Sequence, residues 1–215
     1  MLRAVHVVTA MALCLVLMAC SPPTTETAHT DEPSAGAIRM AVVGDSITDA
    51  DSPDLAGGVP GPESWVSYAV GEDIELAGGW ARWGATTAEM VAAVREPFDA
   101  DVLVILAGTN DAGWTSCEDT GSHLVQLARN AGVNVVVLSS VPPLDAAPQS
   151  AVDLNTCLEA LAEQHAWTWV DAASGLRENG TFIEGMSTDG VHPSEAGARI
   201  IGEAIAAAVL GAAPR

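Results

Sequence analysis

The sequence contains no lysine, and its 8 basic residues, all of them arginine, are outnumbered by 28 aspartates and glutamates. The net charge of −20 argues against nucleic-acid binding and against attachment to an anionic membrane through a basic patch. Without lysine there is no Walker A loop, which needs one to reach the nucleotide phosphates. The HExxH, CxxC and GxGxxG patterns are also missing. Zincins, thioredoxin-like redox proteins and simple dinucleotide-binding proteins are therefore disfavoured.

The first twenty residues have the pattern of an export signal. Arg3 precedes an apolar run over residues 7–19 in which only Thr9 is polar. The run is shorter than a membrane span of about 20 residues and fits a signal peptide over residues 1–19. Its end, Leu17-Met18-Ala19-Cys20, resembles a bacterial lipobox, whose cysteine carries the lipid. We expect an exported protein of the bacterial cell envelope, lipid-anchored at Cys20. Plain secretion and an uncleaved anchor are the alternatives.

Residues 20–37 are predicted to be a flexible linker between the lipidated cysteine and a domain over residues 38–215. This segment is rich in proline, threonine, serine and acids, and has no apolar periodicity. Cys14 would leave with the signal peptide, so Cys117 and Cys157 are the two cysteines left in the domain. In an oxidising location we expect them to form a disulfide, with two buried free thiols as the alternative.

From residue 38 onward, short apolar runs alternate with segments of helical periodicity. Strands are expected at 38–43, 75–77, 101–107, 133–139 and 167–170, and helices at 86–95, 122–130, 150–165 and 193–210. Continuously apolar strands that alternate with helices predict a parallel sheet covered on both faces. Ligands of such sheets bind beyond the carboxyl ends of the strands, so we expect the chemistry there.

Four polar blocks follow the predicted strands or precede the last helix. They are Gly44-Asp45-Ser46-Ile47-Thr48, the segment 78–87, Gly108-Thr109-Asn110-Asp111 and Asp189-Gly190-Val191-His192-Pro193. Each block alone is weak evidence for a catalytic site, because Gly-Asp-Ser is a common turn sequence and a single histidine is more often a surface or capping residue. Together they supply a hydroxyl nucleophile, a histidine, a carboxylate three residues before it, and candidate oxyanion donors.

This constellation resembles the SGNH/GDSL hydrolase superfamily over roughly residues 38–210, with all four blocks in the family's order. The resemblance implies an α/β fold, a three-layer α/β/α sandwich with a five-stranded parallel sheet. It implies Ser46 as nucleophile, Asp189 and His192 as the rest of a catalytic triad, and an oxyanion hole from Ser46, Gly84 and Asn110. The second block lacks the asparagine that often precedes its glycine in the family, so Gly79 is a rival to Gly84. The sequence has no G-x-S-x-G motif, the nucleophile elbow of conventional α/β-hydrolases, so that fold is disfavoured.

These residue types suit acyl transfer for a physical reason. A serine hydroxyl is a poor nucleophile near neutral pH and needs a base within hydrogen-bond reach, which His192 can provide. The other imidazole nitrogen needs an acceptor to fix the tautomer, and Asp189 is close enough in sequence to fold back onto the ring. Attack on an ester carbonyl creates an oxyanion, which requires hydrogen-bond donors already in position.

The substrate is less well specified. Trp80, Trp83 and Trp114 are expected in loops near the site and are candidate substrate contacts, as sugar platforms or as an acyl pocket; core or loop anchoring is the alternative. We interpret the chain as a serine carboxylic ester hydrolase acting on short-chain, acetyl-type esters of small molecules or carbohydrates. An acyltransferase with the same machinery and a non-catalytic binding lipoprotein are the alternatives. We expect a monomer that touches the membrane only through its lipid, with no metal or cofactor.

Overall fold

The computed structural model describes residues 36–213. The predicted signal peptide, Cys20 and almost all of the predicted linker lie outside the described residues, so those assignments stay predictions. Within residues 36–213, none of the helices combines the length and the apolar character that crossing a bilayer requires.

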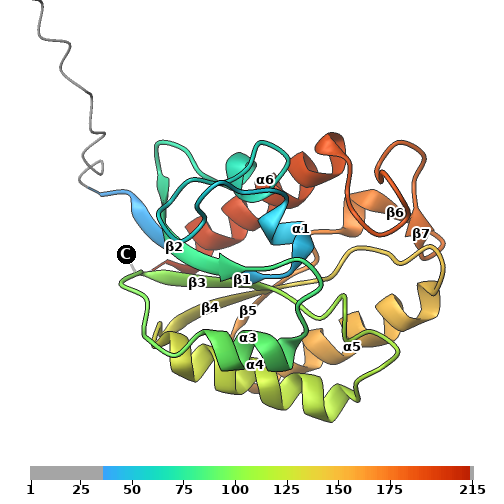
Figure 1. Cartoon of the computed structure of the whole chain (residues 1–215), viewed down its shortest axis with the longest axis horizontal. Helices are drawn as coiled ribbons and strands as arrows, with labels where there is room; N and C mark the ends of the chain where they lie inside the picture. Colours follow the sequence, from blue (N-terminus) through green and yellow to red (C-terminus); the bar gives the residue numbers. More distant parts are fainter. Residues whose placement is uncertain (1–35, 214–215) are drawn as a thin grey trace, which may run out of the picture. The chain divides into compact units, whose positions relative to one another are not determined.

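Five parallel strands form one sheet in the order β2-β1-β3-β4-β5 (Figure 1). Their bounds are β1 Ile38–Gly44, β2 Ile74–Ala81, β3 Val102–Leu106, β4 Val135–Ser139 and β5 Thr168–Val170. The predicted α/β fold with a five-stranded parallel sheet is confirmed. Because β1 pairs with both β2 and β3, the strand order reverses at β1, which creates a switch point at the carboxyl edge of the sheet.

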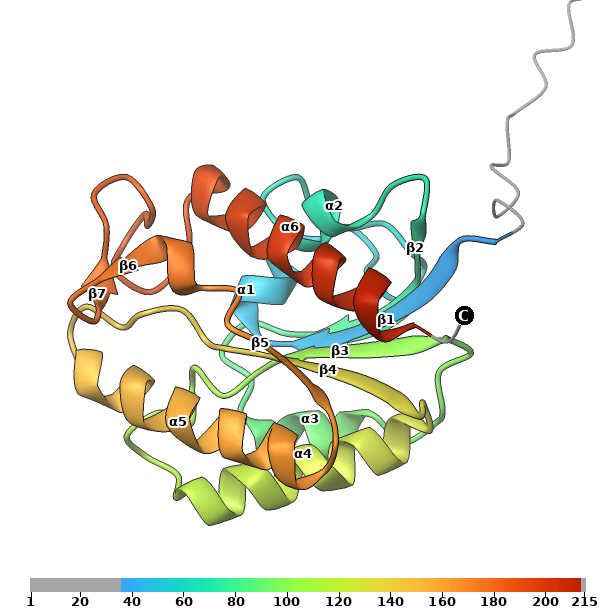
Figure 2. The same cartoon turned by 180° about the vertical axis from the view of Figure 1, so that it is seen from behind.

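Helices cover both faces of this sheet (Figures 1 and 2). One face carries α3 (Thr87–Ala93), α4 (Cys117–Ala131) and α5 (Pro148–Gln164), and the other carries α2 (Val66–Ala69) and α6 (Glu195–Ala212). The short α1 (Ser46–Asp49) directly follows β1. A 3₁₀ turn at Ser174–Leu176 leads into a small antiparallel pair, β6 (Arg177–Glu178) with β7 (Thr181–Phe182).

The apolar strands are buried on both sides, which explains why they lack a polar face in the sequence. In β1, Ala41 and Val43 belong to the core under α3, α4 and α5, whereas Met40 and Val42 belong to the core under α2 and α6. The central strand β3 alternates in the same way and is fully buried along its length. Side chains that alternate between two cores hold β1 and β3 rigidly, so the loops that follow them have fixed starting points.

Strand β2 extends further than predicted. The sequence places a strand only at residues 75–77 and treats 78–87 as a loop, but β2 runs to Ala81. The register with β1 shifts between Met40 and Ala41, opposite Gly78, and pairing then continues through Gly79 against Val42. Parallel pairing with a central strand thus overrides the turn preference of two consecutive glycines.

The helix boundaries shift by one to five residues from the predicted ones. Helix α4 begins at Cys117 instead of residue 122, because the Ser116 side chain caps it by accepting a hydrogen bond from the Asp119 N–H at 3.0 Å. The four-residue helices α1 and α2 and the β6–β7 pair have no counterpart among the predicted elements. Elements this short are set by tertiary contacts and leave little periodicity in the sequence.

The disulfide between Cys117 and Cys157 joins the start of α4 to the middle of α5 across 40 residues. Replacing both cysteines with serine should lower the free energy of unfolding by about 4 kcal/mol, because closing a loop of this length restricts the unfolded chain. Urea unfolding of the oxidised protein and the double variant measures this. Reduction should bring the wild type to the variant's midpoint; equal midpoints under oxidising conditions would contradict the expectation.

Candidate active site

Ser46 is the first residue of α1, immediately beyond the carboxyl end of β1. Asp45 caps this helix, since its Oδ1 accepts a hydrogen bond from the Ile47 N–H at 3.0 Å. The turn is possible because residue 44 is glycine: a Cβ there would lie 2.7 Å from the carbonyl oxygen of Leu106. The chain therefore leaves the strand abruptly and brings the Ser46 hydroxyl to the edge of the sheet.

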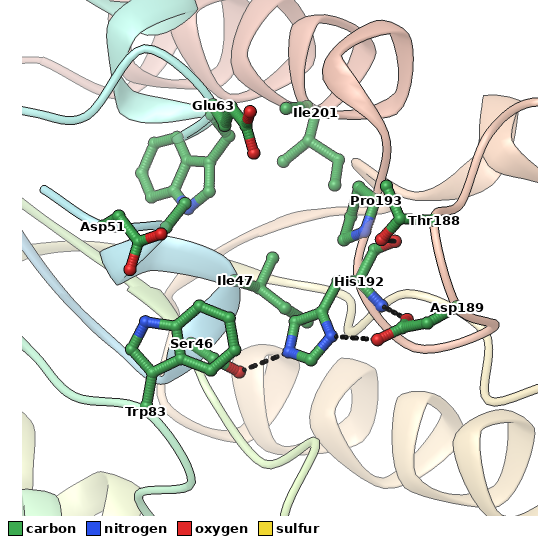
Figure 3. A pocket seen from close by; sticks show the side chains of 13 residues that line it. Ser46, Ile47, Asp51, Glu63, Trp83, Thr188, Asp189, His192, Pro193 and Ile201 are labelled. Carbon is green, nitrogen blue, oxygen red and sulfur yellow. Dashed lines mark hydrogen bonds and ion pairs between the residues drawn. The ribbon is translucent and has the colours of Figure 1, made fainter.

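His192 and Asp189 meet Ser46 from the loop that precedes α6 (Figure 3). The Nε2 atom of His192 lies 2.9 Å from the Ser46 Oγ, and its Nδ1 atom lies 2.7 Å from Asp189 Oδ2. An ionised carboxylate accepts only, so Nδ1 carries a proton and Nε2 of the neutral ring can accept the proton of Ser46. Three residues from opposite ends of the domain thus form one continuous hydrogen-bonded chain.

Asp189 is held in place independently of the imidazole. Its Oδ1 accepts hydrogen bonds from the backbone N–H groups of Val191 at 2.9 Å and His192 at 2.8 Å. Burial raises the pKa of Asp189, but these bonds and the one from the His192 ring outweigh it and bring the pKa down to about 2. The carboxylate is therefore ionised at neutral pH and available to stabilise a protonated His192.

Hydrogen bonds also fix the loop that carries His192. The Ser187 hydroxyl donates to the carbonyl oxygen of His192 at 2.7 Å and accepts from the Gly190 N–H at 2.8 Å. The carbonyl oxygen of Gly190 in turn accepts from the Asp145 N–H at 2.9 Å. These hydrogen bonds fix the backbone on both sides of the histidine.

The predicted oxyanion donors lie in loops that are tied together. Asn110, in the loop after β3, donates its side-chain Nδ2–H to the carbonyl oxygen of Ala85 at 3.0 Å, next to Gly84. This leaves the second N–H of the Asn110 amide for another acceptor. Gly84 has a φ of +70° and faces open space, whereas a Cβ on Gly79, inside β2, would lie 2.3 Å from the Val42 carbonyl oxygen. Of the two rival glycines, only Gly84 lies in an open loop; its role remains a prediction.

A second polar network, formed by Asp111, Thr87 and His123, holds the loop that carries Asn110. Asp111, next in sequence, is 1% exposed and accepts hydrogen bonds from the Thr87 N–H at 2.9 Å and the Thr87 hydroxyl at 2.8 Å. The Thr87 Oγ1 also lies 3.0 Å from His123 Nδ1. These contacts attach the loop after β3 to the beginning of α3. The sequence did not predict this network, because it joins residues that lie 24 and 36 positions apart along the chain.

A cavity of about 180 Å³ opens beside Ser46 and His192 (Figure 3). Its apolar walls come from Ile47 in α1, from Ala198 and Ile201 in α6, and from Trp65 and Pro193. Trp65 is fully buried, and its indole N–H donates to Thr48 Oγ1 at 3.0 Å. Ala50 and Trp83 also line it, and the polar side chains besides Ser46 and His192 are those of Asp51, Glu63, Thr188 and Asp189. Among residues 36–213, no group of three or more histidine, cysteine or acidic side chains could hold a metal ion.

Of the three tryptophans predicted near the substrate, only Trp83 lines this cavity. Trp83 is 50% exposed, and the centroid of its ring lies 5.0 Å from that of the His192 ring. Trp80 is in β2, packs against the core, and has the Arg82 guanidinium 5.6 Å from its ring. Trp114 is exposed and lies outside the cavity lining. The expectation for Trp80 was wrong about its loop position because β2 is longer than predicted.

Comparison with known proteins agrees with this architecture. Residues 42–200 match the model of a family described as GDSL-like lipase/acylhydrolase. The chain is similar to a variant of Axe2, an acetyl-xylooligosaccharide esterase from Geobacillus stearothermophilus, at 19% identity and a TM-score of 0.66, over 82% of this chain and 96% of that one. It is also similar to a lipase/acylhydrolase from Enterococcus faecalis, at 18% identity and a TM-score of 0.64, over 82% and 98%. These likenesses show a common fold. No curated protein sequence matches the chain.

One acid beside the nucleophile has an unusual environment. Asp45 is fully buried, and its Oδ2 has no hydrogen-bond partner within the described part of the chain. Burial raises the pKa of Asp45 to about 6, although the hydrogen bond from Ile47 and the nearby His192 lower it. In the unfolded chain the pKa of an aspartate is about 3.9. Between these two values the native state binds more protons than the unfolded state, so its stability falls as the pH rises.

Replacing Asp45 with asparagine should remove this pH-dependent loss. The amide oxygen can still accept from the Ile47 N–H, but the side chain no longer titrates. Relative to the wild type, Asp45→Asn should therefore gain free energy of unfolding between pH 4 and pH 7, by up to about 3 kcal/mol at roughly 1.4 kcal/mol per pKa unit. Urea unfolding at pH 4, 5.5 and 7 tests this. A constant difference between the two proteins would contradict it.

Proposed function

The chain belongs to the GDSL-like lipase/acylhydrolase family, and from this premise we propose that it is an exported serine esterase that hydrolyses short-chain acyl esters. The observation that carries the proposal is the hydrogen-bonded chain Ser46–His192–Asp189, with distances of 2.9 and 2.7 Å, beside a small cavity. The arrangement supplies a nucleophile, a base that can take its proton, and a carboxylate that orients the base.

The proposed reaction has two acyl-transfer steps. Ser46 Oγ attacks the ester carbonyl while its proton passes to His192 Nε2, and Asp189 stabilises the imidazolium that forms. The proton then moves to the alcohol oxygen as the single bond between that oxygen and the acyl carbon breaks. The alcohol leaves, and the acyl group remains on Ser46. Water repeats the sequence: it gives a proton to His192, attacks the acyl carbon, and releases the acid as Ser46 recovers its proton.

The oxyanion of each tetrahedral intermediate needs donors in fixed positions. We propose the backbone N–H groups of Ser46 and Gly84 and the free N–H of the Asn110 amide. Support comes from the start of α1, where backbone N–H groups have no intrahelical partner, and from the hydrogen bond that attaches Asn110 to the Gly84 loop. Each such donor is worth on the order of 10²–10³ in rate.

The size of the cavity supports a short acyl group. Its volume is about 180 Å³, and Trp65 and Ile201 are both buried in its wall. Sites for drug-sized ligands occupy about 300–1,000 Å³, so a long chain would have to lie outside this cavity. We therefore propose acetyl or another short acyl group as the part of the substrate that stays on Ser46.

Trp83 supports a carbohydrate as the alcohol. Trp83 is 50% exposed and lies beside the His192 that would protonate the leaving oxygen. A flat aromatic face of this kind can stack against the apolar face of a sugar ring. Acetylxylan esterases among the similar structures act on acetylated sugars, which adds support by analogy. We propose an acetylated oligosaccharide outside the cytoplasm as the substrate class.

Hydrolysis of p-nitrophenyl esters from acetate to palmitate, and of an acetylated xylo-oligosaccharide, tests the proposal on residues 21–215. Activity should be highest on acetate and fall beyond butyrate. Ser46→Ala should lower kcat by at least about 10³-fold without changing the unfolding midpoint, because it removes the nucleophile and little volume.

Each other outcome excludes part of the proposal. An active Ser46→Ala variant would remove Ser46 as the nucleophile, and maximal activity on palmitate would replace the short acyl group with a lipid. Transfer of the acetyl group to an added sugar, in preference to water, would make the protein an acyltransferase. Ligand binding without any turnover would make it a binding lipoprotein.

Anchoring through Cys20 is a separate part of the proposal. Cys20→Ala in the full chain should move the protein from the membrane fraction to the soluble exported fraction, because a lipid-bearing cysteine would be lost while the domain is unchanged. Fractionation with immunodetection measures this, and Cys14→Ala is the matched control that should stay in the membrane fraction. Continued membrane association of Cys20→Ala would exclude lipidation there.

A further inference from the structure

Two carboxylates stand at the rim of the cavity without a charge partner. Asp51 follows α1 and Glu63 precedes Trp65, and both side chains are exposed (Figure 3). Among residues 36–213, neither forms a hydrogen bond or ion pair with another side chain. Asp189 lies across the cavity, but its charge is engaged with His192. The rim therefore presents net negative charge to anything that enters.

No cation in the lining offsets this charge. The chain has no lysine, and no arginine lines the cavity. Arg82, adjacent to Trp83, is paired with Glu89 at 2.6 Å. Arg199, on α6, lies over the Tyr68 ring at 4.5 Å and is 4.0 Å from Glu195. The arginines closest in sequence to the lining residues are thus engaged with other groups.

The acyl group is the part of the substrate that must occupy this cavity. In the proposed function the alcohol leaves while the acyl group remains on Ser46, whose side chain lines the cavity. Beyond Ser46, the apolar side chains of Trp65, Ala198 and Ile201 enclose the space, so a substituent at the end of a short acyl chain comes between these walls and the rim. Apolar walls strengthen the electrostatic effect of charges nearby.

We propose that Asp51 and Glu63 are specificity-determining residues that exclude anionic acyl groups and favour neutral or cationic ones. The inference rests on the proposed esterase function and names the substrate class of that same site. An anionic acyl group would meet two uncompensated carboxylates, whereas an ammonium group of the same size would be attracted to them. Because both carboxylates are partly screened by water, we expect an effect of about tenfold for the pair.

Three p-nitrophenyl esters test this: butyrate, 3-aminopropanoate, whose ammonium group replaces the terminal methyl, and hemisuccinate, which carries a carboxylate there. The wild type should have a higher kcat/KM for 3-aminopropanoate than for hemisuccinate. Asp51→Asn with Glu63→Gln should reduce this ratio by about tenfold, and high salt should reduce it in the wild type alone. Dividing each kcat/KM by the kcat/KM of the same protein for butyrate removes any general change in activity that the substitutions cause.

The matched control neutralises two carboxylates at the opposite edge of the sheet. Glu72→Gln with Asp73→Asn, in the exposed turn before β2, changes the net charge by the same amount and should leave the ratio of the two esters at its wild-type value. An effect equal to that of the rim variant would overturn the proposal, since it would make net charge responsible instead of the rim.

The remaining outcomes separate this proposal from the esterase function. Suppose that Ser46-dependent hydrolysis of butyrate persists, but Asp51→Asn with Glu63→Gln keeps the wild-type ratio of kcat/KM for 3-aminopropanoate to that for hemisuccinate. The proposed charge selection by Asp51 and Glu63 is then wrong, whereas the esterase function stands. A wild type with a higher kcat/KM for hemisuccinate than for 3-aminopropanoate would likewise overturn the proposed charge selection alone. If none of the three esters shows Ser46-dependent hydrolysis, the esterase function is wrong, and the charge selection that rests on it is wrong too.

Discussion

Parallel pairing of β1 with both β2 and β3 is the constraint on which the site depends. It brings the carboxyl ends of three strands to one edge, where the chain leaves each strand into a functional loop. Ser46 follows β1, Gly84 follows β2 and Asn110 follows β3. A shift of one residue in the regular pairing of β1 with β3 would place side chains of one strand against the wrong core, so the packing that stabilises the fold also fixes the separation of the loops that carry Ser46 and Asn110. The proposed catalytic geometry therefore depends on the packing of the core.

Two buried carboxylates near the nucleophile, those of Asp45 and Asp111, differ in their effect on the stability of the fold. Asp45 is fully buried beside the nucleophile and has one carboxylate oxygen unpartnered within residues 36–213, an arrangement that costs free energy unless it is compensated. Asp111 is equally buried, but both of its oxygens accept hydrogen bonds from Thr87. Asp111 thus supports the loop after β3, whereas Asp45 combines a helix cap with an unfavourable charge next to Ser46.

The sequence predicted those parts of the molecule that depend on local pattern. Apolar runs bounded by Gly-Asp or Gly-Thr-Asn identified β1 and β3, because strands buried on both faces must be apolar throughout. The spacing of Asp189 and His192 predicted their contact, since a short turn can bring side chains three residues apart together. The extension of β2, by contrast, depends on pairing with β1, and Trp80 was consequently expected in a loop. The cavity depends on residues 51–65 packing against α6, a long-range contact that neither segment encodes alone.

The placement of charge around Ser46 resolves a conflict within the proposed chemistry. Negative charge stabilises a protonated His192 but destabilises the oxyanion that forms at the same moment. Asp51, Glu63 and Asp189 line the cavity with His192, whereas the proposed donors Gly84 and Asn110 are not among its lining residues and belong to the loops that lead to α3 and α4. An acidic cavity is therefore compatible with anionic intermediates, provided that the carbonyl oxygen of the substrate points away from the rim, toward Asn110.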